Sequence, residues 1–201
     1  MLRKQLRPAI LMTLVLCVVT GFIYPGVVTG LAQLIFPRQA NGSLVTANGR
    51  VVGSALIGQP FTRPEYFHPR PSAAGSGYDA SASSGTNKGP TDAKLADTLI
   101  MQAVDSAVKN DRARKGAIPS DMVTSSASGL DPHISPANAY LQVARVARTR
   151  GVDSAAVRAL LDRRVEGRQF GFFGEPRVNV LLLNMAVDSA FGAPKALAPA
   201  K

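Results

Sequence analysis

The fold of this chain is decided by residues 8–36, which read PAILMTLVLCVVTGFIYPGVVTGLAQLIF. The stretch holds no Asp, Glu, Lys, Arg or His. Because a helix rises about 1.5 Å per residue, the stretch is long enough to cross a hydrocarbon core of about 30 Å. We therefore predict that residues 8–36 form a single transmembrane helix.

Three other interpretations of this stretch fit less well. A secretory signal peptide has an apolar region of only about 7–15 residues that ends at a small-residue cleavage site, whereas this apolar run continues. Cys17 lies between Leu16 and Val18, without the small neighbours that lipid attachment needs. Apolar helices of this length are rarely the core of a soluble protein. A retained membrane anchor is the best interpretation.

Basic residues gather on the N-terminal side of the span. Arg3, Lys4 and Arg7 precede it, while only Arg38 follows it closely. By the positive-inside rule, this asymmetry predicts that residues 1–7 are cytoplasmic. We then expect an extracytoplasmic domain over residues 37–192 and a C-terminal tail over residues 193–201. The protein would be a single-pass plasma membrane protein whose main domain faces the periplasm or the cell surface.

The span also carries small residues that a lipid-facing helix does not need. Gly26 and Gly30 form a G-x-x-x-G pair, and Thr20 and Gly21 lie one to two turns earlier. Small residues at this spacing let two helix backbones approach closely, which predicts a partner helix in the membrane. Glycine is also common in spans without a partner, so the pattern leaves both interpretations open. Pro25 removes a backbone donor and predicts a kink.

The composition after the span limits the possible partners. This part of the chain holds 20 basic and 13 acidic residues, a net charge of +7, which fits acidic lipid headgroups or an acidic protein partner. Nucleic acid is not expected, because Trp is absent and the basic residues are not interleaved with aromatic ones. Cys17 is the single cysteine and lies in the span, so we expect neither disulfides nor thiolate chemistry outside it.

Local signals after the span alternate between strand, loop and helix patterns. Residues 43–57 alternate toward β-branched and apolar types around Asn48-Gly49, which tolerates a tight turn, and this predicts a β-hairpin. Residues 59–71 contain four prolines and are predicted to be extended and pinned by aromatic side chains. Residues 72–90 are rich in Ser, Gly and Ala, which predicts a flexible loop unless contacts order it.

Capping residues and apolar spacing predict about four helices. Their ranges are 91–115, 136–151 after a Ser135 cap, 153–165 with an Asp153 cap, and 178–191. On the first helix we expect one buried face, made by Leu95, Leu99, Val104 and Val108. The predicted fold class is therefore mixed α/β: one N-terminal transmembrane helix, then one extracytoplasmic domain with a small β-sheet and about four helices.

No residue pattern in the chain indicates catalysis. Its two histidines, His68 and His133, are too few for a zinc site without suitable Cys or carboxylate spacing. Asp131-Pro132-His133 lacks a G-x-S-x-G elbow to hold a serine nucleophile, and turn hydrogen bonding is the simpler role for both histidines. Gly85 to Gly89 is followed by Pro90 and does not match a Walker loop. We predict neither a metal site nor enzymatic activity.

Five stretches, in order along the chain, together resemble one family. They are GSALIGQ (53–59), YFHPRPSA (66–73), SGTNKGPT (84–91), SGLDPHISP (128–136) and GEPRVNVL (174–181). In this respect the chain resembles the C subunit of the Kdp-type potassium-transporting ATPase of bacteria and archaea. It departs from the family pattern at Thr86 and Lys88, where Ser and Leu are expected, and at Ala127, where Gly is usual.

The resemblance implies an accessory, non-transporting subunit of an ATP-driven, high-affinity potassium uptake complex. The implied partners are a channel-like potassium-binding subunit, a P-type ATPase subunit and a very small single-span subunit. The family is described as a catalytic chaperone that raises the ATP affinity of the ATPase subunit, and as nucleotide binding. ATP is cytoplasmic, however, and we expect nearly all of this chain outside. An ATP effect would therefore act through the partner subunits.

Two functions follow, and we favour the first. In the first, the external domain docks over the potassium entrance of the channel-like subunit and stabilises the assembly. In the second, the chain is a direct nucleotide-binding co-catalyst that contacts phosphates through Asn87 and Gly89. The candidates for domain integrity or the subunit interface are Asp131, His133, Glu175, Arg177 and Asn179. We expect Asp131, Glu175 and Arg177 to form ion pairs or helix-end contacts within the chain.

Overall fold

The computed structural model describes residues 2–194, so most of the predicted tail, residues 195–201, lies outside the described range. Contacts along the backbone divide the chain into two units, Met1–Ser54 and Ala55–Lys201. The first unit holds the span and a hairpin, and the second holds the remaining elements. Mixed α/β architecture with one N-terminal apolar helix is as predicted.

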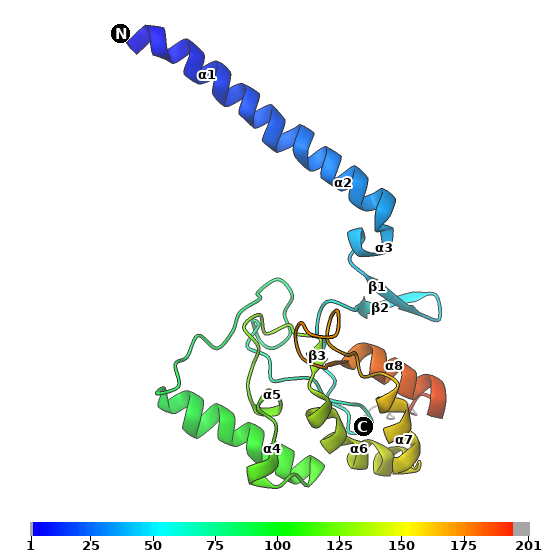
Figure 1. The fold of residues 1–201 in the computed structure, drawn as a ribbon. Coiled ribbons are helices and arrows are strands. Elements are labelled where there is room, and N and C mark those ends of the chain that lie inside the picture. Colours follow the sequence, from blue (N-terminus) through cyan, green and yellow to red (C-terminus); the bar gives the residue numbers. More distant parts are fainter. Residues whose placement is uncertain (1, 195–201) are drawn as a thin grey trace, which may run out of the picture. The chain divides into compact units, whose positions relative to one another are not determined.

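The predicted span is one long helix. It runs through α1 (Leu2–Val18), a π-helical turn η1 (Val19–Ile23) and α2 (Tyr24–Ile35), drawn as a continuous rod in Figure 1. Within it, Lys4–Ile35 is 32 residues long, apolar enough to cross a membrane, and unburied in its most apolar window. At about 1.5 Å per residue it is roughly 48 Å long, which exceeds a hydrocarbon core of about 30 Å.

The π-helical turn lies directly before Pro25. Proline has no N–H to donate to the carbonyl of Gly21, and a local widening of the helix is one way to accommodate that loss. The hydroxyl of Thr20 donates to the carbonyl of Leu16 at 2.7 Å, so this polar group is satisfied inside the helix. The helix therefore presents no unpaired hydroxyl at Thr20 to an apolar environment.

The predicted hairpin is confirmed. After the short helix α3 (Pro37–Ala40), strands β1 (Leu44–Ala47) and β2 (Arg50–Ser54) pair antiparallel. Asn48 and Gly49 have φ angles of 50° and 74°, the left-handed values that a two-residue hairpin turn of this type needs. Ser54 Oγ also donates to the carbonyl of Gly42 at 2.7 Å. The hairpin thus brings the end of β2 close to the residues that precede β1.

The second unit is mostly helical, with one very short sheet. In chain order it holds η2 (Lys94–Ile100, π-helical), α4 (Met101–Asp111), η3 (Lys115–Ala117, 3-10), α5 (Ser120–Val123), β3 (His133–Ile134), α6 (Pro136–Arg150), α7 (Ser154–Asp162), β4 (Val178–Asn179) and α8 (Val180–Phe191). Strands β3 and β4 pair antiparallel, with His133 opposite Asn179 and Ile134 opposite Val178.

Helices α6 and α7 begin at the predicted caps Ser135 and Asp153, and α8 begins at a third cap, Asn179. The side chains of Ser135, Asp153 and Asn179 accept hydrogen bonds from the backbone N–H groups of Asn138, Ala155 and Leu182, each at 3.1 Å. Helix α6 ends as predicted at Gly151, which has a φ of 67°. Helix α7 ends earlier than expected, at Asp162 rather than near Val165. Capping residues therefore predicted the starts of helices more accurately than the apolar pattern predicted the end of α7.

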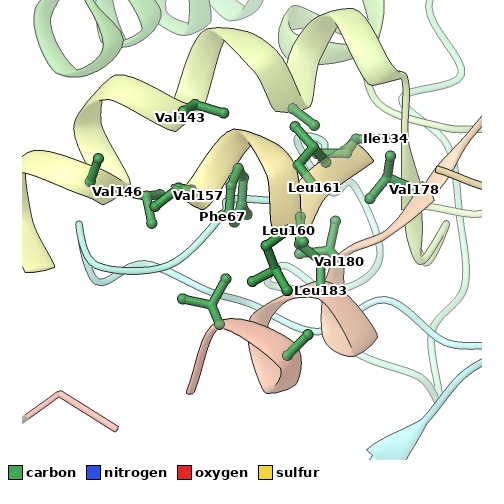
Figure 2. Close-up of a cluster of buried hydrophobic side chains, with 14 residues drawn as sticks. Phe67, Ile134, Val143, Val146, Val157, Leu160, Leu161, Val178, Val180 and Leu183 are labelled. Carbon is green, nitrogen blue, oxygen red and sulfur yellow. The ribbon is translucent and has the colours of Figure 1, made fainter. Parts of the chain in front are cut away.

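The core of the second unit lies among α6, α7 and α8, and Figure 2 shows its side chains converging from these helices. Its buried members are Phe67, Ile134, Ala139, Val143, Val146, Ala147, Val157, Leu160, Leu161, Val178, Val180, Leu183, Ala186 and Val187. Phe67 comes from the proline-rich segment and is fully buried. That segment is thereby pinned by an aromatic side chain, as predicted.

The prediction of a helix over residues 91–115 was wrong in two respects. Helix α4 stops at Asp111, because Arg112 takes a left-handed φ of 56°, so it does not reach Lys115. Its buried residue is Ala107, while Leu99 on η2 is 37% exposed. Apolar spacing identified a stripe, but burial of that stripe depends on what packs against it, and the described residues cover it only in part.

Contacts order the Ser- and Gly-rich segment of residues 72–90. Ser72 Oγ donates to the carbonyl of Gly129 at 2.6 Å, and Ser84 N donates to the carbonyl of Ser128 at 3.0 Å. Gly129 has a φ of 66°, and a Cβ there would lie 2.5 Å from the carbonyl oxygen of Ser84. A side chain at this position would separate the two segments, so glycine is required.

Candidate partner interface

The motif of residues 66–73 is held by two buried side-chain amides. Asn184 on α8 accepts from Phe67 N at 2.8 Å and donates to Phe67 O at 2.9 Å. Gln142 on α6 accepts from His68 N at 2.6 Å and donates to His68 O at 3.0 Å. Each amide therefore satisfies both backbone groups of one residue. We refer to Asn184 and Gln142 as the amide clamps.

The amide clamps solve a problem set by the sequence of the motif. An extended, proline-interrupted segment has no strand partner, yet its buried N–H and C=O groups need hydrogen bonds. A side-chain amide offers both a donor and an acceptor in one group, as a strand would. Sequence reasoning missed both clamps. The available signal was an amide on the same helix face as apolar residues, such as Asn184 within the run Leu181 to Val187.

A buried ion pair also supports this motif. Arg145 Nε donates to Asp111 Oδ1 at 2.7 Å, with only 3% and 4% of the two side chains exposed. Arg145 Nη1 also donates to the carbonyls of Pro64 and Tyr66, at 2.6 and 2.8 Å. Its Nη2 donates to Gln142 Oε1 at 2.7 Å, so the guanidinium joins one clamp to the motif. The charge of Arg145 is thus compensated by one carboxylate and distributed over three oxygen acceptors.

The aromatic start of the motif is fixed by a second arginine. Arg150 donates to Asp188 Oδ1 and to the carbonyl of Glu65, both at 2.7 Å, and its guanidinium lies 5.0 Å from the ring centre of Tyr66. The hydroxyl of Tyr66 donates to Asp188 Oδ2 at 3.0 Å. Contacts among Arg150, Asp188 and Tyr66 therefore hold the segment that precedes Phe67 in place.

The surroundings of His68 indicate a structural role for its side chain. Its Nε2 lies 3.0 Å from the carbonyl of Arg63, and burial, reinforced by the charge of Arg145, lowers the pKa of His68 below its usual value. The imidazole is therefore neutral at pH 7 and fits the role of a hydrogen-bonded core residue. It lines a cleft of about 530 Å³, together with Arg70, Tyr78 and Asp111.

A charged network connects this motif to the band that contains Asp131 and His133. Arg70 Nη1 lies 3.1 Å from Asp131 Oδ2, and Asp131 Oδ1 accepts from His133 N at 2.9 Å. Partial burial acts to raise the pKa of Asp131, but the hydrogen bonds from His133 and the charge of Arg70 outweigh it and hold the pKa below its usual range. The hydroxyl of Tyr78 donates to the carbonyl of Arg70, and its burial raises the pKa of Tyr78.

The structure brings the predicted interface residues together. Strand pairing sets His133 opposite Asn179 and so joins the bands of residues 131–136 and 175–179 through two paired residues in each. Asn179 caps α8, and its Nδ2 donates to the carbonyl of Ala55 at 2.8 Å. Glu175 and Arg177 lie on the hairpin that leads into β4, and both are exposed.

The predicted ion pairs of this region are present. Arg168 Nη2 lies 2.9 Å from Glu175 Oε2, and Arg177 Nε lies 3.0 Å from Glu166 Oε2. Arg70 and Asp131 form the third pair, described above. Because the pairs of Glu175 and Arg177 are largely exposed, they contribute little to stability and remain free to exchange partners.

Comparison with known proteins identifies the family. The family described as KdpC, K+-transporting ATPase, c chain, matches residues 6–189. The chain belongs to the KdpC family. A potassium-transporting ATPase KdpC subunit from Gemmatimonas aurantiaca is 62% identical over 187 residues, which cover 92% of this chain and 93% of the relative. KdpC subunits from Koribacter versatilis and Myxococcus xanthus are 54% and 59% identical, over 96% and 90% of this chain and 98% and 86% of theirs.

KdpC membership makes the chain a subunit of a K+-transporting ATPase, and its anchor fits that assignment. The predicted packing residues of the span lie on an open surface. A Cβ added at Gly21, Gly26 or Gly30 would meet no atom within 4 Å, apart from its own helix. The helix surface at each of these glycines is therefore open to the approach of another helix.

The residues predicted for nucleotide contact in this KdpC chain lie apart from the clamped motif. Asn87 is exposed, has a φ of 53°, and its Nδ2 donates to Ser84 Oγ at 3.4 Å. Gly89 is exposed and has open space around its Cα. Between them, Lys88 pairs with Asp92 at 2.8 Å. Neither Asn87 nor Gly89 lines the 530 Å³ cleft, and nucleotide contact here stays a prediction.

Of the three departures from the KdpC pattern, the structure explains one. Lys88 forms the ion pair with Asp92, whose carboxylate also accepts from Leu95 N at the start of η2. Ala127 contributes backbone to the contact with Gly85, where an added Cβ would lie 3.0 Å from Ala127 O. Nothing in the structure explains Thr86 or the alanine at position 127. Among residues 2–194, no three His, Cys, Asp or Glu side chains converge on a possible metal position.

Proposed function

We propose that this chain is the accessory, non-transporting subunit of an ATP-driven potassium uptake complex, with no catalytic site of its own. Its proposed partners are a channel-like potassium-binding subunit, a P-type ATPase subunit and a small single-span subunit. Membership of the KdpC family supports the complex, because the relatives are named as subunits of a potassium-transporting ATPase. The absence of a catalytic motif from the sequence supports the accessory role.

The proposed location is the plasma membrane, with residues 1–7 in the cytoplasm and residues 37–192 in the periplasm. The single long apolar helix supports the anchor, and the cluster of Arg3, Lys4 and Arg7 before it supports the orientation. In this orientation the domain docks over the potassium entrance of the channel-like subunit. The orientation is tested by the labelling experiment that closes the Discussion.

The observation that carries the proposal is the open small-residue face of the span. Gly26 and Gly30, four residues apart, lie on one side of the helix, and an added Cβ at either would meet no described atom within 4 Å outside its own helix. Thr20 and Gly21 add small side chains one to two turns earlier. Backbones that approach closely gain van der Waals contact, which is the main source of helix association in lipid. We infer that this face packs against a helix of a partner subunit.

Bulky substitutions test this inference. Gly26→Leu or Gly30→Leu should reduce the amount of the larger subunits recovered with this chain after detergent extraction, because the leucine side chain holds the helices apart. Val28→Leu adds bulk on the opposite side of the helix and is the matched control. Equal recovery with all three variants would contradict the proposed packing face.

We further propose that the chain raises the ATP affinity of the ATPase subunit through contacts between subunits. The amide clamps and the Arg145–Asp111 pair support this, because a rigid domain can couple a docking surface to distant subunits. In the assembled complex, variants that weaken docking should then raise the KM for ATP with less effect on the maximal rate.

Binding of labelled ATP to the full chain in detergent separates the two candidate functions. Our proposal predicts no saturable binding by the isolated chain and no effect of Asn87→Ala. Saturable binding that Asn87→Ala abolishes would contradict it and would favour the direct nucleotide-binding co-catalyst, with Asn87 and Gly89 at the phosphates.

A further inference from the structure

A β-hairpin between α7 and α8 ends in three exposed phenylalanines. Glu166 and Arg177 exchange backbone hydrogen bonds of 2.8 and 3.0 Å, and Gln169 and Phe173 exchange two bonds of 2.9 Å. The turn between them holds Phe170 and Gly171 at left-handed φ angles of 53° and 84°. We call the three side chains Phe170, Phe172 and Phe173 the aromatic tip.

The aromatic tip is exposed because the hairpin holds it there. Phe170, Phe172 and Phe173 are 87%, 65% and 57% exposed, and the rings of Phe172 and Phe173 lie 4.2 Å apart. Burying a phenylalanine stabilises a protein by about 1.5–3 kcal/mol, so exposing three side by side forgoes a large gain. Contiguous exposed apolar side chains on a rigid support mark an interaction site.

The surroundings of the aromatic tip are basic. Arg163 and Arg164, at the end of α7, are exposed and form no ion pair among residues 2–194. They line a hollow of about 220 Å³ at the base of the hairpin, together with Glu166 and Asn179. The two arginines carry charge that complements an anionic group, and their guanidiniums suit phosphate.

The hairpin also lies where the chain enters the second unit. Ala55 is the first residue of that unit, and its carbonyl accepts from Nδ2 of Asn179, which follows the hairpin directly. In the first unit, the strands return the chain so that Ser54 contacts Gly42, shortly after the span ends at Ile35. The covalent connection from the span therefore tethers the second unit, and with it the hairpin, to a membrane that the span crosses. Such a tether gives the aromatic tip a high effective concentration near a bilayer.

We propose that the aromatic tip inserts into the interfacial layer of an anionic membrane while Arg163 and Arg164 bind lipid phosphates. The aromatic tip is too small for a stable protein interface of its own. Three phenylalanines offer at most about 450–750 Å², whereas such interfaces bury about 800 Å² on each partner. A few apolar rings beside basic residues are sufficient for a second membrane contact in a chain that already has an anchor.

Tryptophan fluorescence tests the insertion directly, because the chain has no tryptophan. Phe172→Trp introduces one reporter in the aromatic tip, and Leu99→Trp introduces one at an exposed apolar position on η2 as the control. Both full-length variants are reconstituted through their span into vesicles of phosphatidylcholine and phosphatidylglycerol, with and without brominated acyl chains. We expect blue-shifted emission and quenching by bromine for Phe172→Trp alone.

Equal, unquenched emission from both variants would overturn the proposal. So would quenching that disappears when the partner subunits are added, because a protein surface would then cover the aromatic tip. Replacing Arg163 and Arg164 together by glutamine should lower the inserted-to-free ratio about 30-fold on anionic vesicles and leave it unchanged on phosphatidylcholine alone. The proposal depends on the anchor and not on the potassium role, so an intact complex with an unquenched aromatic tip would reject this inference alone.

Discussion

Phe67 and Phe170 both lie on irregular, glycine- or proline-rich segments, yet one is fully buried and the other is 87% exposed. The two segments differ in which groups form hydrogen bonds with their backbone. Two side-chain amides and the Arg145 guanidinium hold the segment of Phe67 inside the domain. The hairpin of Phe170 satisfies its own backbone groups and needs no support from the core. Backbone hydrogen bonding thus distinguishes the phenylalanine that builds the core from the one that stays exposed.

The largest expected effect comes from truncating the two phenylalanines. Phe67→Ala should lower the free energy of unfolding by about 3–5 kcal/mol, because it leaves a cavity among α6, α7 and α8. Phe170→Ala should change it by less than about 0.5 kcal/mol, because its ring is already in solvent. Urea unfolding of the full chain in detergent, followed by circular dichroism, measures both. Similar losses for the two variants would contradict the different roles assigned to Phe67 and Phe170.

Breaking the buried ion pair should have a similar or slightly smaller effect. Arg145→Leu leaves Asp111 charged in the interior and removes the donors of two carbonyls, which predicts a loss of about 3–5 kcal/mol. Lys115 and Asp105 form a pair with side chains 67% and 69% exposed, and Lys115→Leu is the matched control. We expect no measurable loss from the control. A loss from Arg145→Leu no larger than the control would show that the pair does not support the motif.

Removing one amide clamp should cost less. Gln142→Leu introduces an apolar side chain of similar size on α6 and leaves the N–H and C=O of His68 without their partners. We expect a loss of about 2–4 kcal/mol, since each buried unsatisfied group costs about 1–3 kcal/mol. Gln102→Leu, at an exposed position on α4, is the control and should be nearly neutral. Amide hydrogen exchange at His68 should increase in the first variant only, and protection that persists would contradict the role of the clamp.

The smallest effect concerns pH. Burial lowers the pKa of His68 in the folded state below 6.5, so the unfolded chain binds a proton first as the pH falls. The contribution of His68 to stability is complete above the unfolded pKa and is lost as the pH falls through the folded pKa. Comparing the stability of the wild type and His68→Gln between pH 7 and pH 5 measures this. The variant should lose less stability over the interval, and equal losses would contradict the assignment.

Local chemistry was sufficient to predict the starts of several elements but not the contacts between them. Asn48-Gly49 fixes its hairpin, and Ser135 and Asp153 fix their helices, because each acts within a few residues. The amide clamps join residues 117 and 74 positions apart, which no local pattern encodes. The incomplete burial at Leu99 was missed for the same reason. His133 and Asn179 were identified from family resemblance, and their pairing across β3 and β4 needed the structure.

The proposed function requires the domain to face the outside of the cell, and one labelling experiment tests this directly. Cys17 is the single cysteine, so Cys17→Ser combined with Ala82→Cys places one thiol on an exposed loop of the second unit. We predict that a membrane-impermeant maleimide labels this thiol in intact spheroplasts and not in sealed inside-out vesicles. Labelling only in the inside-out vesicles would contradict the proposed orientation and the docking of the domain over the potassium entrance.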